Sequence, residues 1–326
     1  MVQTAVGGEM KRICCVALTA LVVAGSAAAQ SQPLADPEAT VVEEFVVVAR
    51  DAGPAWWRVS DDDTTVYILA LPDGALPPGL IWDQVGLRRR LKGSNALIGG
   101  GRAYRMSLSF KTLGLLLSLR RSLRQKGEME DDLPEPLRVR FVAAREKAGK
   151  DAGHYKGWGP MVAGFILIGD SRDGPRGRDP QDDVRRTARK LKVRERETVK
   201  RDAAPVLKEF KAGLTPDVQT ACLSAAMDDI AAGLEPANAA ALGWARGDVG
   251  AALKAPRGIE KCFLAVSGGP EVWRQGIEDQ AAAIAAELER PGKAVAMVRL
   301  RQLIAKGGVI EQLEATGLDV DGPAVR

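Results

Sequence analysis

WWRVSDDDTTVYILAL, residues 56–71, is the stretch that decides the fold. Its aromatic and β-branched residues predict extended chain on both sides of the acidic triplet Asp61 to Asp63, and the pair is expected to form a hairpin. The triplet is interpreted as a solvated turn, because a calcium loop needs spaced ligands and a following glutamate that are absent here. A β-branched run over residues 41–50 predicts one further strand upstream.

Strand signals recur at the other end of the chain. Residues 294–298 predict a strand, and residues 96–98 predict a short buried strand that ends at the glycine triplet Gly99 to Gly101. No P-loop lysine and serine follow the triplet and no dinucleotide fingerprint surrounds it, so it is interpreted as a turn. Helical patterns fill most of the remaining chain. The sequence therefore predicts an α/β protein with a central mixed sheet, formed by both chain ends and covered by helices.

Three helical segments precede the C-terminal half. The leucine-rich segment 111–124 predicts a buried helix with cations at its C-terminal end. Residues 137–150 predict an amphipathic helix, and the apolar segment 159–169 predicts a core helix that is too short to span a membrane. Alanine-rich helices follow, and a helical subdomain is expected over about residues 183–290.

The N-terminus has the features of a cleavable signal peptide. Lys11 and Arg12 precede an apolar run that ends in small residues suited to cleavage. The run is shorter than the roughly 20 residues that a membrane anchor requires. We therefore expect a periplasmic or secreted protein with no membrane span after cleavage. Its expected parts are a signal peptide at residues 1–29, a mobile leader at 30–40 and a single domain at 41–326.

Two of the four cysteines, Cys222 and Cys262, lie beyond the signal peptide. In an oxidising compartment an even pair of this kind favours one disulfide. Two separately buried thiols are the alternative.

Charge and residue types narrow the possible functions. The chain has 46 basic and 42 acidic residues, so its net charge of +4 gives no broad field for nucleic acid or an anionic membrane. His154 is the only histidine, so neither a Ser-His-Asp triad nor a paired-histidine metal site can form without it. Because no motif surrounds His154, it is interpreted as a structural residue, with a catalytic role as the alternative.

Segments at both ends of the chain form a series with a recognisable order. It begins with residues 54–61, 65–73 and 77–82, continues through 133–138, 155–160, 221–223 and 240–248, and closes with 291–298 and 307–320. In this order the segments resemble the TraB/GumN family over essentially the whole mature chain. From relatives such as the Tiki metalloproteases, the resemblance implies a divalent metal held by two Gly-x-x-His motifs and a glutamate, with an open position for water.

This sequence departs from the family pattern at each of those positions. The first motif reads Ala-Leu-Pro-Asp, so Asp73 stands in the histidine position. The expected glutamate falls near Gly99 or Gly100. The second motif reads Arg-Leu-Arg-Gln over residues 299–302, so Gln302 replaces the second histidine. The same motif contains two cations, Arg299 and Arg301, which would repel a divalent ion. The family chemistry is therefore expected to be absent, and no cofactor is predicted.

Three functions remain open at this point, and whether the chain is an enzyme is one of the open questions. The favoured hypothesis is a non-catalytic binding protein of the cell envelope whose partner is a peptide, a glycan or an envelope protein. A hydrolase of the family type is the second, either metal-dependent or built on Asp73 with His154 and a tyrosine, Tyr67 or Tyr155. An envelope scaffold built on the alanine-rich helices is the third. The candidate ligand contacts are Tyr67, Asp73, Arg299 and Arg301.

Overall fold

The computed structural model describes residues 53–99, 103–105, 109–172, 177–196 and 200–323. All of these belong to one compact unit, Pro33–Arg326. The predicted signal peptide, the leader and the strand expected at residues 41–50 lie outside the described residues. Within these ranges no helix is both long enough and apolar enough to cross a membrane.

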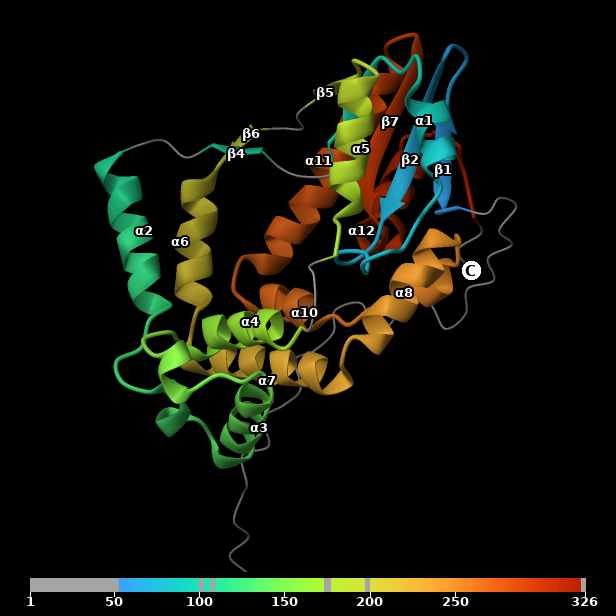
Figure 1. The fold of residues 1–326 in the computed structure, drawn as a ribbon. Coiled ribbons are helices and arrows are strands. Elements are labelled where there is room, and N and C mark those ends of the chain that lie inside the picture. Colours follow the sequence, from blue (N-terminus) through green and yellow to red (C-terminus); the bar gives the residue numbers. More distant parts are fainter. Residues whose placement is uncertain (1–52, 100–102, 106–108, 173–176, 197–199, 324–326) are drawn as a thin grey trace, which may run out of the picture. The chain divides into compact units, whose positions relative to one another are not determined.

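A six-stranded mixed sheet confirms the expected α/β class (Figure 1). Its strands span Trp56–Ser60 (β1), Thr64–Leu71 (β2), Ala96–Ile98 (β3), Arg194–Arg196 (β5), Gly292–Arg299 (β7) and Val320–Asp321 (β8). They are ordered β5-β3-β7-β2-β1-β8. The strands β5, β3, β7 and β2 are parallel, whereas β1 is antiparallel to both of its neighbours. Both chain ends therefore contribute strands, as the sequence predicts.

The predicted hairpin joins β1 to β2. Its turn is closed by Asp61, whose Oδ1 accepts the backbone N–H of Thr64 at 2.8 Å. All three acidic residues of the turn are exposed. The triplet is therefore the solvated turn that the sequence predicts.

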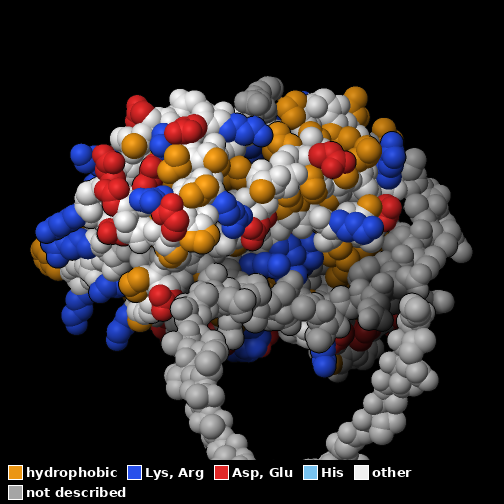
Figure 2. All heavy atoms as spheres, turned by 90° about the horizontal axis from the view of Figure 1, so that it is seen from below, with side chains coloured by type: hydrophobic (Ala, Val, Ile, Leu, Met, Phe, Trp, Pro, Cys, Tyr) orange, Lys and Arg blue, Asp and Glu red, His pale blue; other side chains and the backbone are white. Residues whose placement is uncertain are grey.

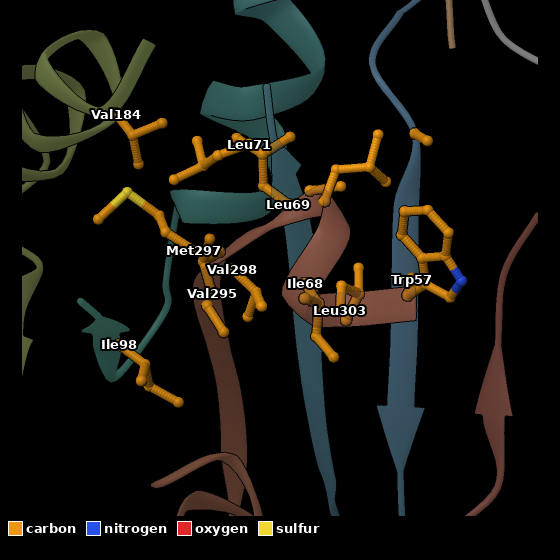
Figure 3. Packing of buried hydrophobic residues seen from close by; sticks show 14 of the residues in the cluster. Trp57, Ile68, Leu69, Leu71, Ile98, Val184, Val295, Met297, Val298 and Leu303 are labelled. Carbon is orange, nitrogen blue, oxygen red and sulfur yellow. The ribbon is translucent and has the colours of Figure 1, made fainter. Parts of the chain in front are cut away.

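The core lies around β2 and β7. Figure 3 shows Ile68, Leu69 and Met297 among the fully buried side chains that fill it. Consecutive residues are buried in both strands, which is typical of parallel strands covered on both faces. The covering helices are α1 (Gln84–Leu91), which contacts β7 and α5 (Pro180–Lys190), and α11 (Gly269–Leu288), which contacts β2 and β7.

Six further helices pack on one another around two smaller apolar clusters. They are α2 (Phe110–Ser122), α3 (Glu135–Lys147), α4 (Pro160–Asp170), α6 (Ala203–Gly213), α7 (Pro216–Ala232) and α10 (Gly258–Ala265). Phe141 of α3, Leu167 of α4 and Leu223 of α7 meet in one cluster. The helical part therefore includes residues before 183, where the predicted helical subdomain begins, as well as residues after it. Cys222 of α7 and Cys262 of α10 form the predicted disulfide, with their Cα atoms 4.8 Å apart.

The helix predicted at residues 111–124 forms as α2, but the prediction that it is buried was wrong. Thr112 is its only buried residue, and Phe110, Leu113 and Leu117 are exposed. A count of leucines measures hydrophobicity, whereas burial depends on which elements lie nearby. The main neighbour of α2 is α6, which covers only part of its surface.

The charged stretch 183–201 is helical only in its first part. Helix α5 ends at Lys190, and the chain then forms β5 and a second short strand, β6 (Lys200–Asp202). Strand β6 pairs in parallel with β4 (Ala103–Arg105) in a separate two-stranded sheet. The remaining elements are α8 (Glu235–Ala245), α9 (Val249–Ala252), α12 (Leu300–Ile304), α13 (Val309–Ala315), η1 (Met129–Asp132) and η2 (Ala152–Tyr155).

Candidate functional site

The parallel pairing of β2 with β7 determines which residues meet at the candidate site. Leu71, the last residue of β2, lies opposite Arg299, the last residue of β7. Segments that leave parallel neighbours at their carboxyl ends emerge at the same edge of the sheet, which is where α/β proteins place their sites. Asp73 and Arg301, each two residues further along, are therefore brought to one edge.

Asp73 and Arg301 form a direct ion pair at this edge. Arg301 Nε donates to Asp73 Oδ2 at 2.6 Å. The Arg301 side chain is 7% exposed and that of Asp73 18%, so the pair is largely removed from water. Arg301 Nη2 also donates to the backbone carbonyl oxygens of Leu253 and Ala255. One guanidinium thus joins three segments that lie far apart in the sequence.

A second acid and a second arginine complete this arrangement. Glu260 Oε2, from α10, lies 3.7 Å from Arg301 Nε. Glu260 Oε1 accepts a hydrogen bond from Arg257 Nε at 3.2 Å. We call Asp73, Arg257, Glu260 and Arg301 the buried charge cluster. Its two acids balance its two arginines in charge, as buried ions require.

Burial raises the pKa of Glu260 above its usual value. The hydrogen bond and charge of Arg257 oppose the rise, as does the charge of Arg301, while the nearby Asp73 carboxylate adds to it. A net rise means that ionising this carboxyl group costs free energy in the folded state. The two arginines therefore compensate the burial of Glu260 only in part.

Arg299 has different surroundings from Arg301. Its Nη1 donates to the backbone carbonyl of Pro72 at 3.1 Å, and the residue is partly exposed. No carboxylate in the described parts of the chain forms an ion pair with Arg299, whereas Arg301 contacts two. Of the two arginines expected to meet a ligand, Arg299 is the one whose charge the described residues leave unmatched.

The donors at this edge do not fit a divalent metal ion. Asp73 is bound to a guanidinium, and Gln302 offers a neutral amide oxygen, which is a poor ligand for a hydrolytic metal. Gly99 has no side chain, and Gly100 lies outside the described residues. Across the described ranges no group of three or more His, Cys, Asp and Glu side chains is arranged to hold a metal ion. Catalytic zinc needs about three protein ligands and an open position, so this donor set does not support metal-assisted hydrolysis.

A carboxylate does approach Gly99, but it too is paired with an arginine. A Cβ atom placed on Gly99 would lie 2.8 Å from Glu195 Oε1, so any side chain there would displace Glu195. Glu195 lies on β5, and its two carboxylate oxygens accept hydrogen bonds from Arg185 Nε at 3.1 and 3.2 Å. Asp73 after β2 and Glu195 on β5 are thus both engaged with guanidinium groups.

His154 has its own set of partners. Its Nε2 lies 2.9 Å from Asp170 Oδ2, and the hydroxyl of Tyr155 donates to the same oxygen at 3.0 Å. Lys150 Nζ lies 3.6 Å from the other oxygen of Asp170. Burial, followed by the bond to Asp170, raises the pKa of Tyr155. These contacts tie η2 to the end of α4.

The other residues of the hypothetical acid-base set also have separate partners. The ring of Tyr67 faces the guanidinium of Arg90, with the guanidinium carbon 5.8 Å from the ring centroid. Asp73 instead bonds to Arg301. No contact between described residues joins Asp73 to His154 or to either tyrosine, so the structure brings Asp73, Arg299 and Arg301 to one edge and gives the rest other neighbours.

Sequence reasoning missed three residues around this edge: Arg257, Glu260 and Trp244. Trp244 Nε1 donates to the carbonyl oxygen of Ala70 at 2.6 Å, and its ring packs against that of Trp82 with centroids 5.3 Å apart. Both tryptophans lie in segments that carry the family resemblance, so a signal for them existed. Arg257 and Glu260 lie outside those segments, and nothing in their local sequence points to the site.

Comparison with known proteins gives one finding. A sequence model of the TraB/PrgY/gumN family matches residues 55–321. No curated protein and no solved structure matches the chain. The matched range includes every strand of the six-stranded sheet and the whole buried charge cluster.

Proposed function

The chain belongs to the TraB/PrgY/gumN family, and from this premise we propose that it is a non-catalytic member, acting as a binding protein of the cell envelope. One observation supports the loss of catalysis most directly. The guanidinium of Arg301 lies between the carboxylates of Asp73 and Glu260, at the edge where the resemblance leads us to expect a divalent cation. A guanidinium neutralises carboxylates but has no open coordination position, so it cannot bind and activate water as a metal ion does.

Arg299 is the proposed contact for a ligand at this edge. The charge of Arg301 is balanced within the buried charge cluster, so Arg301 has a structural role. Arg299 keeps most of its donors after its single bond to the Pro72 carbonyl, and a guanidinium binds a carboxylate or a phosphate through two parallel hydrogen bonds. We therefore propose a ligand that presents an anionic group, such as a peptide carboxylate or an acidic glycan.

Export is part of the same proposal. The basic residues, apolar run and small residues at the N-terminus favour a signal peptide. The disulfide between Cys222 and Cys262 is consistent with an oxidising compartment, since such bonds are rare in a reducing cytosol. Both observations support a location in the periplasm or outside the cell.

Calorimetric titration of the protein with Zn²⁺, Mn²⁺ and Co²⁺, together with peptide hydrolysis before and after chelation, tests the loss of metal chemistry. We expect no binding that depends on Asp73, so Asp73→Ala should titrate like the wild type and like Asp62→Ala, a control in the exposed hairpin turn. The opposite result would be binding of one equivalent of metal that is lost in Asp73→Ala but not in Asp62→Ala, together with peptide hydrolysis that chelation stops. That result would show that the chain is a metal-dependent hydrolase.

Thermal shift with peptides that carry either a free or an amidated C-terminus, and with acidic glycans, tests the ligand assignment. Anionic ligands should raise the melting temperature of the wild type and of the exposed control Arg58→Gln, but not that of Arg299→Gln. A shift that survives Arg299→Gln, or the absence of any shift with every ligand, contradicts the assignment.

A further inference from the structure

Helix α2 presents an apolar face that the described part of the chain leaves open. Phe110 is 95% exposed, Leu113 54% and Leu117 48%. Their spacing of three and four residues places them on one side of the helix. Ser109 caps the helix by accepting the backbone N–H of Thr112, so Phe110 begins the first turn and its position is defined.

The opposite side of α2 is the one that packs. Thr112 is buried, and Leu119 and Leu123 are partly buried against a cluster that includes Leu214 and Phe210. Helices α2 and α6 lie side by side in Figure 1, and α6 is the principal neighbour of α2. The exposed leucines are therefore additional to those that hold the helix in place.

Cations continue the exposed face toward its C-terminal end. By helical spacing Arg121 lies on the same side as Leu117, and it is exposed. Arg124, just beyond the helix end, is also exposed, with its guanidinium carbon 4.6 Å from the ring centroid of Trp158. Residues 109–127 contain five cations and no acid, and no carboxylate of the described ranges pairs with any of the five: Lys111, Arg120, Arg121, Arg124 and Lys126. Figure 2 shows Lys and Arg side chains gathered at the left edge, the side on which Figure 1 places α2.

The sequence that contains α2 is more basic than the net charge of the chain indicates. Between Asp83 and Glu128 it has 11 Lys and Arg residues and no Asp or Glu. Four of the 11 lie on α1 or at its C-terminal end, and the other seven lie between Arg102 and Lys126. The net charge of +4 conceals this stretch because the acids lie elsewhere in the sequence. A helix with exposed Phe and Leu and with Lys and Arg unopposed by acids has the composition of an interfacial membrane-binding helix.

We propose that the exposed face of α2 binds the surface of an anionic lipid bilayer. Phe110, Leu113 and Leu117 enter the boundary between headgroups and acyl chains, and Arg120, Arg121 and Arg124 contact the lipid phosphates. Charge complementarity favours this partner over a second copy of the chain. Two copies of α2 facing each other would bring their lysines and arginines together, and like charges at an interface are unfavourable.

Flotation with lipid vesicles tests the proposal. The protein is mixed with vesicles of phosphatidylcholine alone, or of equal parts phosphatidylglycerol and phosphatidylcholine, at low and high salt. All variants are made in the same full chain, so any membrane affinity of the N-terminal segment is common to them. One variant removes the apolar face, Phe110→Ser/Leu113→Ser/Leu117→Ser, and one removes the cations, Arg120→Gln/Arg121→Gln/Arg124→Gln. The matched control, Ile81→Ser/Val139→Ser/Ile259→Ser, removes three exposed apolar residues outside α2.

We expect the wild type and the control to float with the anionic vesicles, and much less with the neutral ones. The cation variant should lose about 100-fold in partition coefficient, since each cation near an anionic surface contributes roughly fivefold. The apolar variant should lose at least tenfold. Circular dichroism and thermal unfolding should match the wild type for all variants, because the altered side chains are exposed.

Three results would overturn the proposal. The first is equal flotation with neutral and anionic vesicles, the second is unchanged flotation of the two α2 variants, and the third is no flotation of the wild type. If the wild type does not float but is a dimer by light scattering, and the apolar variant is a monomer, the face binds a second copy of the chain instead.

Discussion

Replacing Arg301 with methionine tests whether the buried charge cluster holds the candidate site together. Methionine keeps much of the length of the side chain but removes the guanidinium. Asp73 would lose its only ion pair among the described residues, Glu260 would keep Arg257 alone, and the carbonyl oxygens of Leu253 and Ala255 would lose a donor. Breaking a buried ion pair by removing one partner costs about 3–5 kcal/mol. The side chains of Asp73 and Glu260 remain 18% and 14% exposed, which favours the lower end of that range, about 3 kcal/mol.

Urea unfolding followed by tryptophan fluorescence measures this difference, and a thermal scan should show a fall of roughly 6–12 °C in Tm. Arg299→Met is the matched control. It removes an arginine two residues away that has one hydrogen bond and no described carboxylate partner, so it should cost no more than about 1 kcal/mol. Asp73→Ala/Arg301→Met should cost less than the sum of its single changes, with a coupling of about 1–3 kcal/mol. If Arg301→Met unfolds within 1 kcal/mol of the wild type, or no differently from Arg299→Met, the cluster does not hold the site.

Three other changes have outcomes that the structure specifies. Glu260→Gln should become more stable relative to the wild type as pH rises from 4.5 to 7. The folded pKa of Glu260 is raised above 4.5, so the wild type binds more protons when folded and loses stability as pH rises through that window, whereas the glutamine variant does not. Urea unfolding at both pH values measures the difference in unfolding free energy between the two proteins, and a difference that is the same at both contradicts this. Cys222→Ala/Cys262→Ala should lower the unfolding free energy by about 4 kcal/mol, from closure of a loop of 40 residues, and oxidised wild type that is no more stable than the variant would show that the bond is not formed. Trp244→Phe should cost about 1–3 kcal/mol, because the Ala70 carbonyl loses its donor; Trp273→Phe, at a partly buried position, is the control, and equal effects of the two changes would exclude the hydrogen bond as the cause.

The strands that position the site could be predicted from the sequence because local preference and burial agree in them. Residues 64–71 and 294–298 combine β-branched side chains with continuous apolar character, and both lie in parallel strands buried on both faces. The order of the strands could not be predicted in the same way. It depends on the pairing of β2 with β7, whose residues lie more than 200 positions apart, and no local pattern encodes a contact of that range.

Helix α2 shows the converse case, in which local preference was correct and burial was not. Its leucines and terminal arginines predict a helix, and the helix forms. The same leucines cannot report whether a second layer of structure covers them. Only the arrangement of α2 against α6 shows that Phe110, Leu113 and Leu117 stay outside.

The surroundings of Arg301 show how far the sequence leads toward the site. Its position after β7 follows from the strand, and its proximity to Asp73 follows from parallel pairing. The hypothesis that it meets an anionic ligand left open whether nearby acids pair with it. Glu260 and two carbonyl oxygens from a distant part of the sequence match that charge, and the sequence contains no signal for their approach.

The departures from the family's metal pattern make physical sense together. A divalent ion beside Asp73 would lie within a few ångströms of the Arg301 guanidinium, and in a largely buried setting such repulsion amounts to several kcal/mol. Arg301 and a metal therefore exclude each other at this edge. Once an arginine supplies the positive charge, an aspartate after β2 is a better partner than a histidine, because the carboxylate accepts the guanidinium donors in a charge-assisted bond. The glutamine at position 302 then has no ion to bind. One guanidinium accounts for the joint between β2, β7 and α10. Under the proposed function it accounts equally for the loss of metal chemistry, since a covalently attached side chain holds the fold but cannot exchange its ligands for water as a metal ion does.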